Sequence, residues 1–232
     1  MKNRILNYAL CIIALASTLL ALPHLPERVP MHFDASGAVD RYGSKYELFL
    51  LPIVMIISNI ASEIGYARAK KKGLDPESRA VMSARINSKV TTVSVTILSA
   101  VFVVLNFGIL YIAYSSTDNL GNLPFDFSGI LTVTLGISIA VLGNYMPKTK
   151  RNGVIGMRSA WSMYNDVTWQ KSNRFAAYVM MAAGIISALC GLIFGGMLSL
   201  FIIVGALAIA AVVVLIYSYR VYCKEKNNVE NN

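Results

Sequence analysis

Six long apolar stretches constrain this chain more than any other feature, at about residues 5–22, 48–66, 91–114, 129–146, 174–194 and 197–218. A helix that crosses a bilayer needs roughly 20 mostly apolar residues, and each stretch reaches or nearly reaches that length. Charged residues make up only 14% of the chain, whereas soluble domains have about a quarter. The sequence therefore predicts an all-α integral membrane protein, a helical bundle of six spans. The first stretch is interpreted as a retained span rather than a signal peptide, because further spans follow it.

Lys and Arg gather at alternate ends of the predicted spans. The N-terminus, the second loop (residues 67–90), the fourth loop and the C-terminal tail are basic, whereas acidic residues outnumber basic ones in the first and third loops. Because short basic loops stay in the cytoplasm, this multi-pass protein of the cell membrane is predicted to have both termini cytoplasmic. The same bias accounts for the net charge of +9, so the lipid bilayer is the expected partner and direct nucleic-acid binding is not predicted.

The first loop, residues 23–47, has the pattern of a small extracellular β-hairpin and is called the hairpin loop. Residues 29–33 and 38–42 favour strands, and the turn between them includes Gly37, which is free to take a positive φ. His24 and His32 lack a third ligand at a defined spacing, so no metal site is predicted. From the residues alone, the hairpin is either a binding face or a cap on the helix bundle.

The fourth loop and the start of the next span, residues 146–174, form a polar stretch called the signature segment. Pro147 ends the preceding helix, Asn152 and Gly156 mark turns, and Asn165 is placed to cap a helix that continues into the fifth span. Two interpretations stay open. The segment is a basic membrane lip with tryptophans at the interface, or a folded patch in which Arg158 anchors a carboxylate or a phosphate.

Few polar side chains fall within or near the predicted spans. Asn59, Asn106 and Asn144 are candidates for hydrogen bonds between helices. Glu63 is the only acidic residue in the spans, and an intramembrane carboxylate is a functional candidate. Its position near the cytoplasmic end favours a salt bridge with a basic residue one to two turns further along the chain.

Small residues recur every fourth position on one face of the fifth span, namely Ala183, Ser187, Gly191 and Gly195. A stripe of this kind lets two helices approach closely. Packing within the chain is favoured over dimerisation, and the oligomeric state stays open.

Both polar segments carry motifs of known families. "LPERVPMHFDASGAVDRYGSK", residues 25–45, resembles an N-terminal domain of unknown function found in many bacterial membrane proteins, and the matching residues are Pro30, His32, Phe33, Gly37, Asp40, Arg41, Gly43 and Lys45. "GNYMPKTKRNGVIGMRSAWSMYNDVTWQKSNR", residues 143–174, is similar to the signature of the SdpI family, and the matching residues are Asn144, Pro147, Asn152, Gly156, Arg158, Trp161, Trp169 and Arg174. One departure from the family pattern is Asn173, where a His is often expected.

The resemblance implies a membrane immunity and signalling protein, with no enzymatic activity, cofactor or metal. It implies two modules, residues 1–90 and residues 91–232. A secreted toxin peptide would meet the hairpin loop, at Pro30, His32, Phe33, Gly37, Asp40, Arg41, Tyr42 and Lys45. A winged-helix repressor would be captured at the inner face by the signature segment, at Asn152, Gly156, Arg158, Trp161, Trp169, Lys171 and Arg174.

Other classes fit the sequence less well. A small multi-pass transporter, the main alternative, would show inverted repeats and broken helices with polar groups at the midplane. No convincing repeat relates the two halves, and no span carries paired charges. An intramembrane hydrolase would need a nucleophile and a base within reach of each other, and neither histidine lies at membrane depth. A membrane scaffold with no toxin role is a third possibility.

Overall fold

The computed structural model describes residues 2–71 and 79–230, so residues 72–78 of the predicted basic loop lie outside the described residues. Six described helices are long and apolar enough to cross a membrane, as predicted. They are α1 (Lys2–Ala21), α2 (Leu50–Lys71), α3 (Arg79–Ser115), α4 (Phe127–Tyr145), α5 (Asp166–Ile193) and α6 (Gly196–Glu230). The chain is a multi-pass, all-α membrane protein with one small two-stranded sheet.

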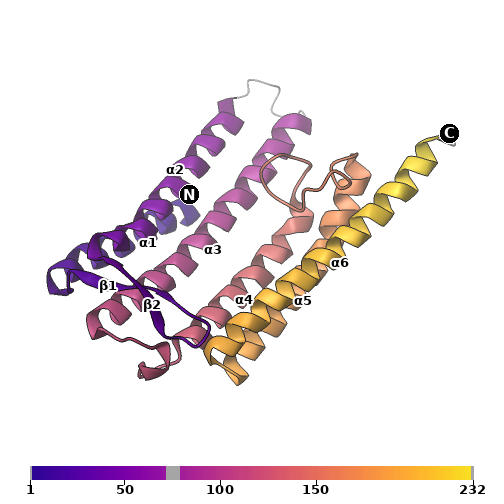
Figure 1. Ribbon diagram of the computed structural model, residues 1–232. Helices are drawn as coiled ribbons and strands as arrows, with labels where there is room; N and C mark the ends of the chain where they lie inside the picture. Colours follow the sequence, from indigo (N-terminus) through magenta and orange to yellow (C-terminus); the bar gives the residue numbers. More distant parts are fainter. Residues whose placement is uncertain (1, 72–78, 231–232) are drawn as a thin grey trace.

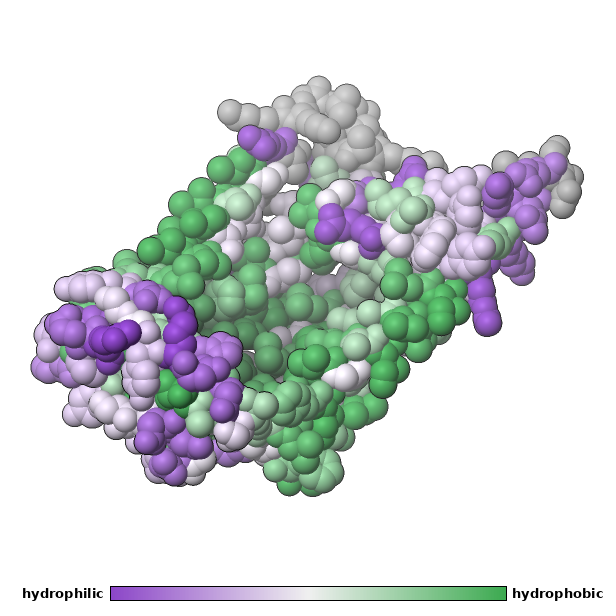
Figure 2. Space-filling view, in the orientation of Figure 1, coloured by the Kyte–Doolittle hydropathy of each residue, from purple (hydrophilic) through white to green (hydrophobic). Residues whose placement is uncertain are grey.

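The helices form two groups that run along the chain in order. α1, α2 and α3 pack on one another, α4, α5 and α6 pack on one another, and α3 lies against α4 between the groups (Figure 1). The hairpin loop, the α3–α4 loop and the α5–α6 turn lie at one end of the bundle, called the hairpin end. The loop before α5 and the C-terminus lie at the other, called the signature end. Figure 2 shows apolar residues on the flank between two polar ends, as expected for a bundle surrounded by lipid.

Two helices are longer than their predicted spans. α3 has 37 residues and α6 has 35, and both continue past the apolar stretch at the signature end. Nothing in these polar extensions breaks a helix, because Pro is absent and the residues are good or neutral helix formers. α5 begins as predicted, since Asn165 Oδ1 accepts a hydrogen bond from Thr168 N at 2.7 Å and Asn165 N donates to Thr168 Oγ1 at 2.9 Å.

The predicted hairpin is present, with strands β1 (Arg28–Phe33) and β2 (Val39–Ser44) paired antiparallel. In the turn, Asp34 Oδ1 accepts hydrogen bonds from Ser36 N at 2.8 Å and Ser36 Oγ at 2.6 Å, and Gly37 has a φ of +85°. These bonds from Ser36 hold the pKa of the Asp34 carboxyl below its usual range, because they favour the carboxylate. Ionised Asp34 therefore stabilises this turn.

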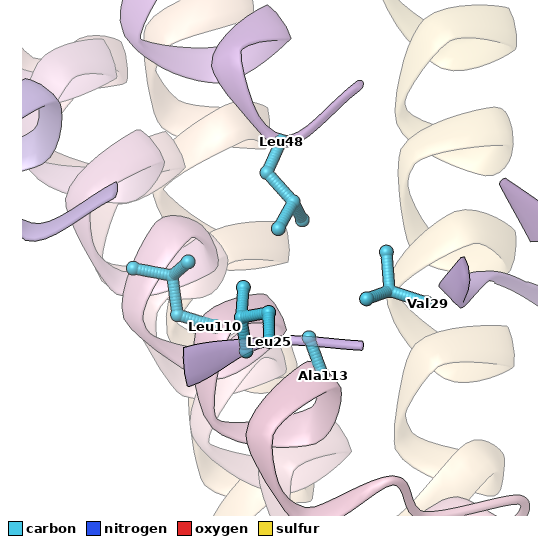
Figure 3. Close-up of a cluster of buried hydrophobic side chains, with 5 residues drawn as sticks. All are labelled: Leu25, Val29, Leu48, Leu110 and Ala113. Atoms are coloured by element: carbon cyan, nitrogen blue, oxygen red, sulfur yellow. The ribbon is translucent and has the colours of Figure 1, made fainter. Parts of the chain in front are cut away.

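An apolar cluster fixes the hairpin to the bundle. Figure 3 shows its five buried side chains: Leu25, Val29, Leu48, Leu110 and Ala113. They come from the entry to β1, from β1 itself, from the short helix η2 (Lys45–Phe49) and from the last turns of α3. The other short helices are η1 (Leu22–His24), η3 (Leu120–Asn122) and η4 (Met146–Lys148). The hairpin is thus packed directly on α3 rather than held only by its two connections.

Two of the predicted intramembrane polar residues join helices. Asn106 on α3 is buried and its Nδ2 donates to Ser17 Oγ on α1 at 3.0 Å. Asn59 on α2 is also buried, and its Nδ2 lies 3.4 Å from Ser99 Oγ on α3. Asn144 differs from the prediction, because its side chain is exposed at the end of α4 and bonds to no other described residue.

Glu63 does form the salt bridge expected near the end of its helix, but with a different partner. Its carboxylate pairs with the guanidinium of Arg4 on α1. The sequence suggested a basic residue further along the same helix, and it could not show that the start of α1 lies beside the second half of α2. The pair therefore joins two helices instead of stabilising one.

α4 and α5 approach each other closely along glycines. A Cβ built on Gly136 would lie 2.6 Å from the backbone oxygen of Gly184, and a Cβ on Gly184 would lie 2.5 Å from the oxygen of Gly136. Ala183, Ser187 and Gly191 of the predicted small-residue stripe are buried on α5 beside this contact. The part of the stripe that lies on α5 serves packing within the chain, as expected. Gly195, the fourth predicted member, lies beyond the end of α5 and has a φ of +58°.

Membrane orientation is the first prediction that experiment can check. After Cys11, Cys190 and Cys223 are replaced by serine, a single cysteine at Ser116 should react with an impermeant maleimide in intact cells, and one at Lys148 only after permeabilisation. Both positions are exposed, at the hairpin end and the signature end respectively. The reverse labelling pattern would show that the loop-charge argument fails for this chain.

Candidate functional site

The signature segment is folded, and two buried residues of α5 hold it. Trp169 is 1% exposed, and its Nε1 donates a hydrogen bond to Thr149 O at 3.0 Å. Asn173, one turn further on, is also 1% exposed. Its Oδ1 accepts from Met157 N at 2.7 Å, and its Nδ2 lies 3.3 Å from Met157 O. Hydrogen bonds from α5 therefore hold the loop at two points, Thr149 and Met157. Asn173, where a His is often expected, provides one of these two anchors.

Gly156 lies over these two anchors. Its φ is +108°, and a Cβ built on it would lie 2.7 Å from Asn173 Oδ1 and 2.9 Å from Cζ2 of Trp169. A side chain at this position would be strained by its φ and would also collide with both anchors. Glycine is thus required by the backbone of this loop, at one of the turns predicted from the sequence.

Two further residues shape the loop. Asn152 Oδ1 accepts from Val154 N at 2.7 Å and from Ile155 N at 2.9 Å, which closes the turn predicted there. Arg151 Nη1 donates to the carbonyl of Met163 at 3.1 Å, and Arg151 Nε pairs with Asp166 Oδ1 at 3.0 Å. Sequence reasoning missed Arg151, because it is one of four basic residues in this loop and its acidic partner lies fifteen positions on.

Arg158 and Trp161, by contrast, remain at the surface. Arg158 is exposed and its Nη1 donates to the carbonyl of Gly153, so the rest of the guanidinium faces solvent. Trp161 is half-buried, with its ring centroid 5.1 Å from that of Tyr219 on α6. The two tryptophans therefore differ in exposure. A partner molecule could contact Trp161, whereas Trp169 is buried between α5 and the loop.

The folded segment docks on the two longest helices. It reaches α6 through Trp161, through the pairing of Tyr164 with Tyr222 at 5.0 Å, and through the ion pair of Lys171 with Glu225 at 2.7 Å. It reaches α3 through Asn87, whose Oδ1 accepts from Lys150 N at 2.9 Å and whose Nδ2 donates to Lys150 O at 3.1 Å. Beside this contact, a recess of about 590 Å³ is lined by Met82, Ser83, Ile86, Lys150, Arg151, Asp166, Trp169 and Gln170.

At the hairpin end, the residues predicted to meet a ligand divide into two sets. Pro30 and Gly37 are buried, while Phe33 and Lys45 are half-buried, with Lys45 Nζ 2.9 Å from Glu27 Oε1. The exposed set on the hairpin is His32, Asp40, Arg41 and Tyr42. His32 Nδ1 lies 2.6 Å from Asp40 Oδ1, and Arg41 Nη2 lies 3.4 Å from Glu47 Oε2. A polar surface with one tyrosine is therefore presented outward.

The tip of the hairpin is tied to the α3–α4 loop. Val39 N donates to Asp118 O at 2.8 Å, and Leu120 N donates to Gly37 O at 2.8 Å. A recess of about 390 Å³ opens at this junction, between the hairpin tip, the α3–α4 loop and the α5–α6 turn. The hairpin tip thus lies beside the junction of the two helix groups.

Asp126 holds the same junction together and was missed in the sequence. Its Oδ1 accepts from Gly129 N at 2.9 Å, which caps α4, and its Oδ2 accepts from Gly196 N at 2.8 Å at the start of α6. The capping of α4 could have been predicted from the sequence, because an acidic residue directly before an apolar run is an N-cap signal. The second role needs the fold, since Gly196 is 70 positions away.

α3 and α6 each contact both ends of the bundle. α3 carries Leu110 and Ala113 under the hairpin and Asn87 beside the signature segment. α6 begins at Gly196 beside Asp126 and carries Tyr219 and Tyr222 under the signature segment. Two continuous helices therefore join the two candidate sites.

Two known protein families match this chain, one over the hairpin and one over the signature segment. The domain of unknown function DUF1648 matches residues 9–56, which contain the hairpin, and the SdpI/YfhL protein family matches residues 148–218, which contain most of the signature segment. The uncharacterized protein YfhL of Bacillus subtilis (strain 168) is 33% identical to this chain over 87 residues, which are 38% of this chain and 77% of that protein. The chain belongs to the SdpI/YfhL protein family. Both resemblances drawn from the sequence are thus confirmed.

A second relative matches along almost the full length. The immunity protein SdpI of Bacillus subtilis (strain 168) is 22% identical over 224 residues, which cover 97% of this chain and 98% of that protein. An uncharacterized protein of Archaeoglobus fulgidus is 52% identical over 40 residues, 17% of this chain and 22% of that protein. No solved structure matches the chain significantly.

Proposed function

We propose that this chain is a membrane immunity protein that protects its cell against a secreted antimicrobial peptide. The observation that carries the proposal is the likeness to the immunity protein SdpI, which extends over 97% of this chain and so includes both candidate sites and all six spans. We propose that protection works by binding the peptide rather than by breaking its bonds. The proposed role is therefore non-enzymatic and uses no cofactor.

The hairpin end is the proposed contact for the toxin. With the predicted orientation it faces outward, and His32, Asp40, Arg41 and Tyr42 are exposed on it. The recess at the hairpin tip is lined mostly by apolar and small residues, among them Leu120, Leu123 and Met197, together with Asp126. A peptide that inserts into membranes is amphipathic, and this surface offers polar groups beside an apolar hollow for its two faces.

The signature end is the proposed site for a soluble partner inside the cell, such as a winged-helix repressor. Arg158 is exposed and Trp161 is half-buried on the surface of the segment, and Arg and Trp are frequent anchors in protein interfaces. A repressor has a basic face for DNA, which the basic signature end would repel. The captured face should therefore be acidic or apolar. Captured repressor would no longer reach its operator.

Signalling would require the two ends to be coupled. A ligand shifts a conformational equilibrium only if it binds the two states with different affinity. α3 and α6 are two elements through which such a shift could pass, because each contacts the hairpin end and the signature segment. We propose that toxin contact at the hairpin moves one of these helices relative to its neighbours.

Transport, the alternative, gains no support from the polar residues in the spans. A transporter needs polar groups available to a substrate near the midplane. Asn59 and Asn106 are instead buried and occupied by hydrogen bonds to neighbouring helices. We therefore propose immunity with signalling, and not transport.

Survival of toxin-sensitive cells that express this chain tests the proposal. Wild-type protein should protect against a purified peptide toxin of the sporulation-delaying type, and Asp40→Ala should lose most of that protection, because it removes an exposed charge and the partner of His32. Arg158→Ala should keep protection but lose capture of the repressor in a membrane pull-down. Glu230→Ala, which removes a carboxylate at the other end of the chain, is the control for Asp40→Ala.

Membrane abundance of every variant is measured by immunoblot. No protection by abundant wild-type protein would contradict the immunity proposal. Full protection by Asp40→Ala would exclude this part of the hairpin from toxin contact. Undiminished capture by Arg158→Ala would exclude that guanidinium from the partner site.

A further inference from the structure

A second recess at the signature end has an unusual concentration of positive charge. Its volume is about 360 Å³, and it is lined by Pro147, Thr149, Lys150, Gln170, Lys171 and Arg174. Three of these six side chains are cationic and none is acidic. The recess lies where η4 leaves α4 and where α5 begins, so its walls are fixed by both helices and by the loop between them.

The positive charge of this recess is only partly compensated within the protein. Lys171 Nζ lies 2.7 Å from Glu225 Oε1. Lys150 and Arg174 are exposed, and neither forms an ion pair with a carboxylate in the described part of the chain. Lys148, at the end of η4, lies 4.3 Å from the ring centroid of Tyr145 and adds a further cation nearby. Like charges that line one recess repel one another, and a bound anion would relieve the repulsion.

The position of the recess indicates which anion it would bind. Arg174 is within the candidate membrane span of α5, and Tyr178, Ala182 and Ile185 follow it on the same helix face. Tyr178 is 59% exposed and Ile185 is 51% exposed. Tyr178 Oη accepts a hydrogen bond from Arg174 Nε at 3.5 Å, an arrangement suited to the boundary between headgroups and acyl chains. A cationic recess thus continues directly into an apolar stripe that faces lipid.

We propose that this recess binds the phosphate of an anionic phospholipid, with the acyl chains of that lipid along the exposed stripe of α5. The guanidinium of Arg174 and the ammonium of Lys150 would bind the phosphate oxygens through charge-assisted hydrogen bonds. A free phosphate would use the charges but not the stripe. The continuity of the two surfaces is what favours a lipid.

A lipid in this position would also stabilise the signature segment. Thr149 and Lys150 line the recess, and the backbone of these two residues accepts from Trp169 and bonds with Asn87. A phosphate held by Lys150 would therefore reinforce the contacts that close the loop on α5 and α3. The inference is independent of toxin and repressor, and its test uses purified protein.

The test is lipid binding by the purified full-length chain in a non-ionic detergent. Native mass spectrometry counts bound phosphatidylglycerol against phosphatidylcholine of the same chain length, and inorganic phosphate alone is a third arm. Lys150→Gln with Arg174→Gln should weaken phosphatidylglycerol binding about tenfold or more, since each basic side chain at a membrane surface contributes measurably. Arg220→Gln with Lys224→Gln is the matched control, because it removes one exposed Arg and one exposed Lys from α6.

A second variant tests whether weaker lipid binding in the first could come from misfolding alone. Gln170→Glu places a carboxylate in the recess at an exposed position and should also weaken phosphatidylglycerol binding, while circular dichroism stays unchanged. Equal binding of the two lipids, or an equal loss in the control variant, would overturn the proposal. Displacement of the lipid by millimolar inorganic phosphate would assign the recess to free phosphate and would overturn the lipid assignment.

Discussion

Valine in place of Gly184 should leave little folded protein in the membrane. A Cβ at this position would lie 2.5 Å from Gly136 O and 2.6 Å from Ala140 N, and both of these are backbone atoms that cannot rotate away. α4 and α5 would have to separate along the glycine contact, which would also remove the packing around Ser187 and Gly191. Overpacking of this kind costs about 3 kcal/mol, at the upper end of the usual range. Because membrane helices associate chiefly through close packing, little else would offset that loss.

The matched control is Gly205→Val. Gly205 lies within α6, and a Cβ built there has no atom within 4 Å apart from the nearby backbone of its own helix and its two chain neighbours. Both substitutions add the same atoms to a glycine in a membrane helix, and they differ only in what those atoms would meet. The measurement is the fraction of a fluorescent-protein fusion that stays monodisperse in detergent after mild heating. Equal behaviour of the two variants would show that the α4–α5 contact does not need glycine.

Features with a local cause were predictable from the sequence. The six spans follow from runs of apolar residues that are long enough to cross a bilayer, and the structure has them. The hairpin follows from turn residues between two short strand-forming runs, and the start of α5 follows from Asn165 directly before it. In each case the residues that determine the structure are neighbours in the chain.

Features that depend on distant contacts could not be read in this way. Arg4 and Glu63 are 59 positions apart, and Asn87 and Lys150 are 63 apart. Nothing in either neighbourhood identifies the partner, because many residues of the same type compete for each pairing. The two tryptophans are a further example. Both fit an interfacial belt by composition, and only the fold of the segment buries Trp169 and leaves Trp161 accessible.

Alanine in place of Gly156 should open the signature segment without unfolding the helices. The φ of +108° disfavours any L side chain, which alone costs about 1–3 kcal/mol. The added Cβ would also lie 2.7 Å from Asn173 Oδ1 and 2.9 Å from Cζ2 of Trp169, so the loop must move off both anchors. The helices need not move, since α5 keeps its own cap at Asn165. The expected result is a locally open loop on an intact bundle.

Limited trypsin digestion measures that opening at the arginines and lysines of the loop. Cleavage after Arg151 and Arg158 should become about tenfold faster in Gly156→Ala, because each 1.4 kcal/mol of lost closure raises the open population tenfold. Gly153→Ala is the control three residues away, since a Cβ on Gly153 has no other atom within 4 Å and its φ is not in the left-handed region. Unchanged cleavage in Gly156→Ala would mean that Trp169 and Asn173 do not hold the loop closed. Faster cleavage with intact helical circular dichroism would mean that they do, and the same variant should then fail to capture a soluble partner that requires Arg158 and Trp161 in fixed positions.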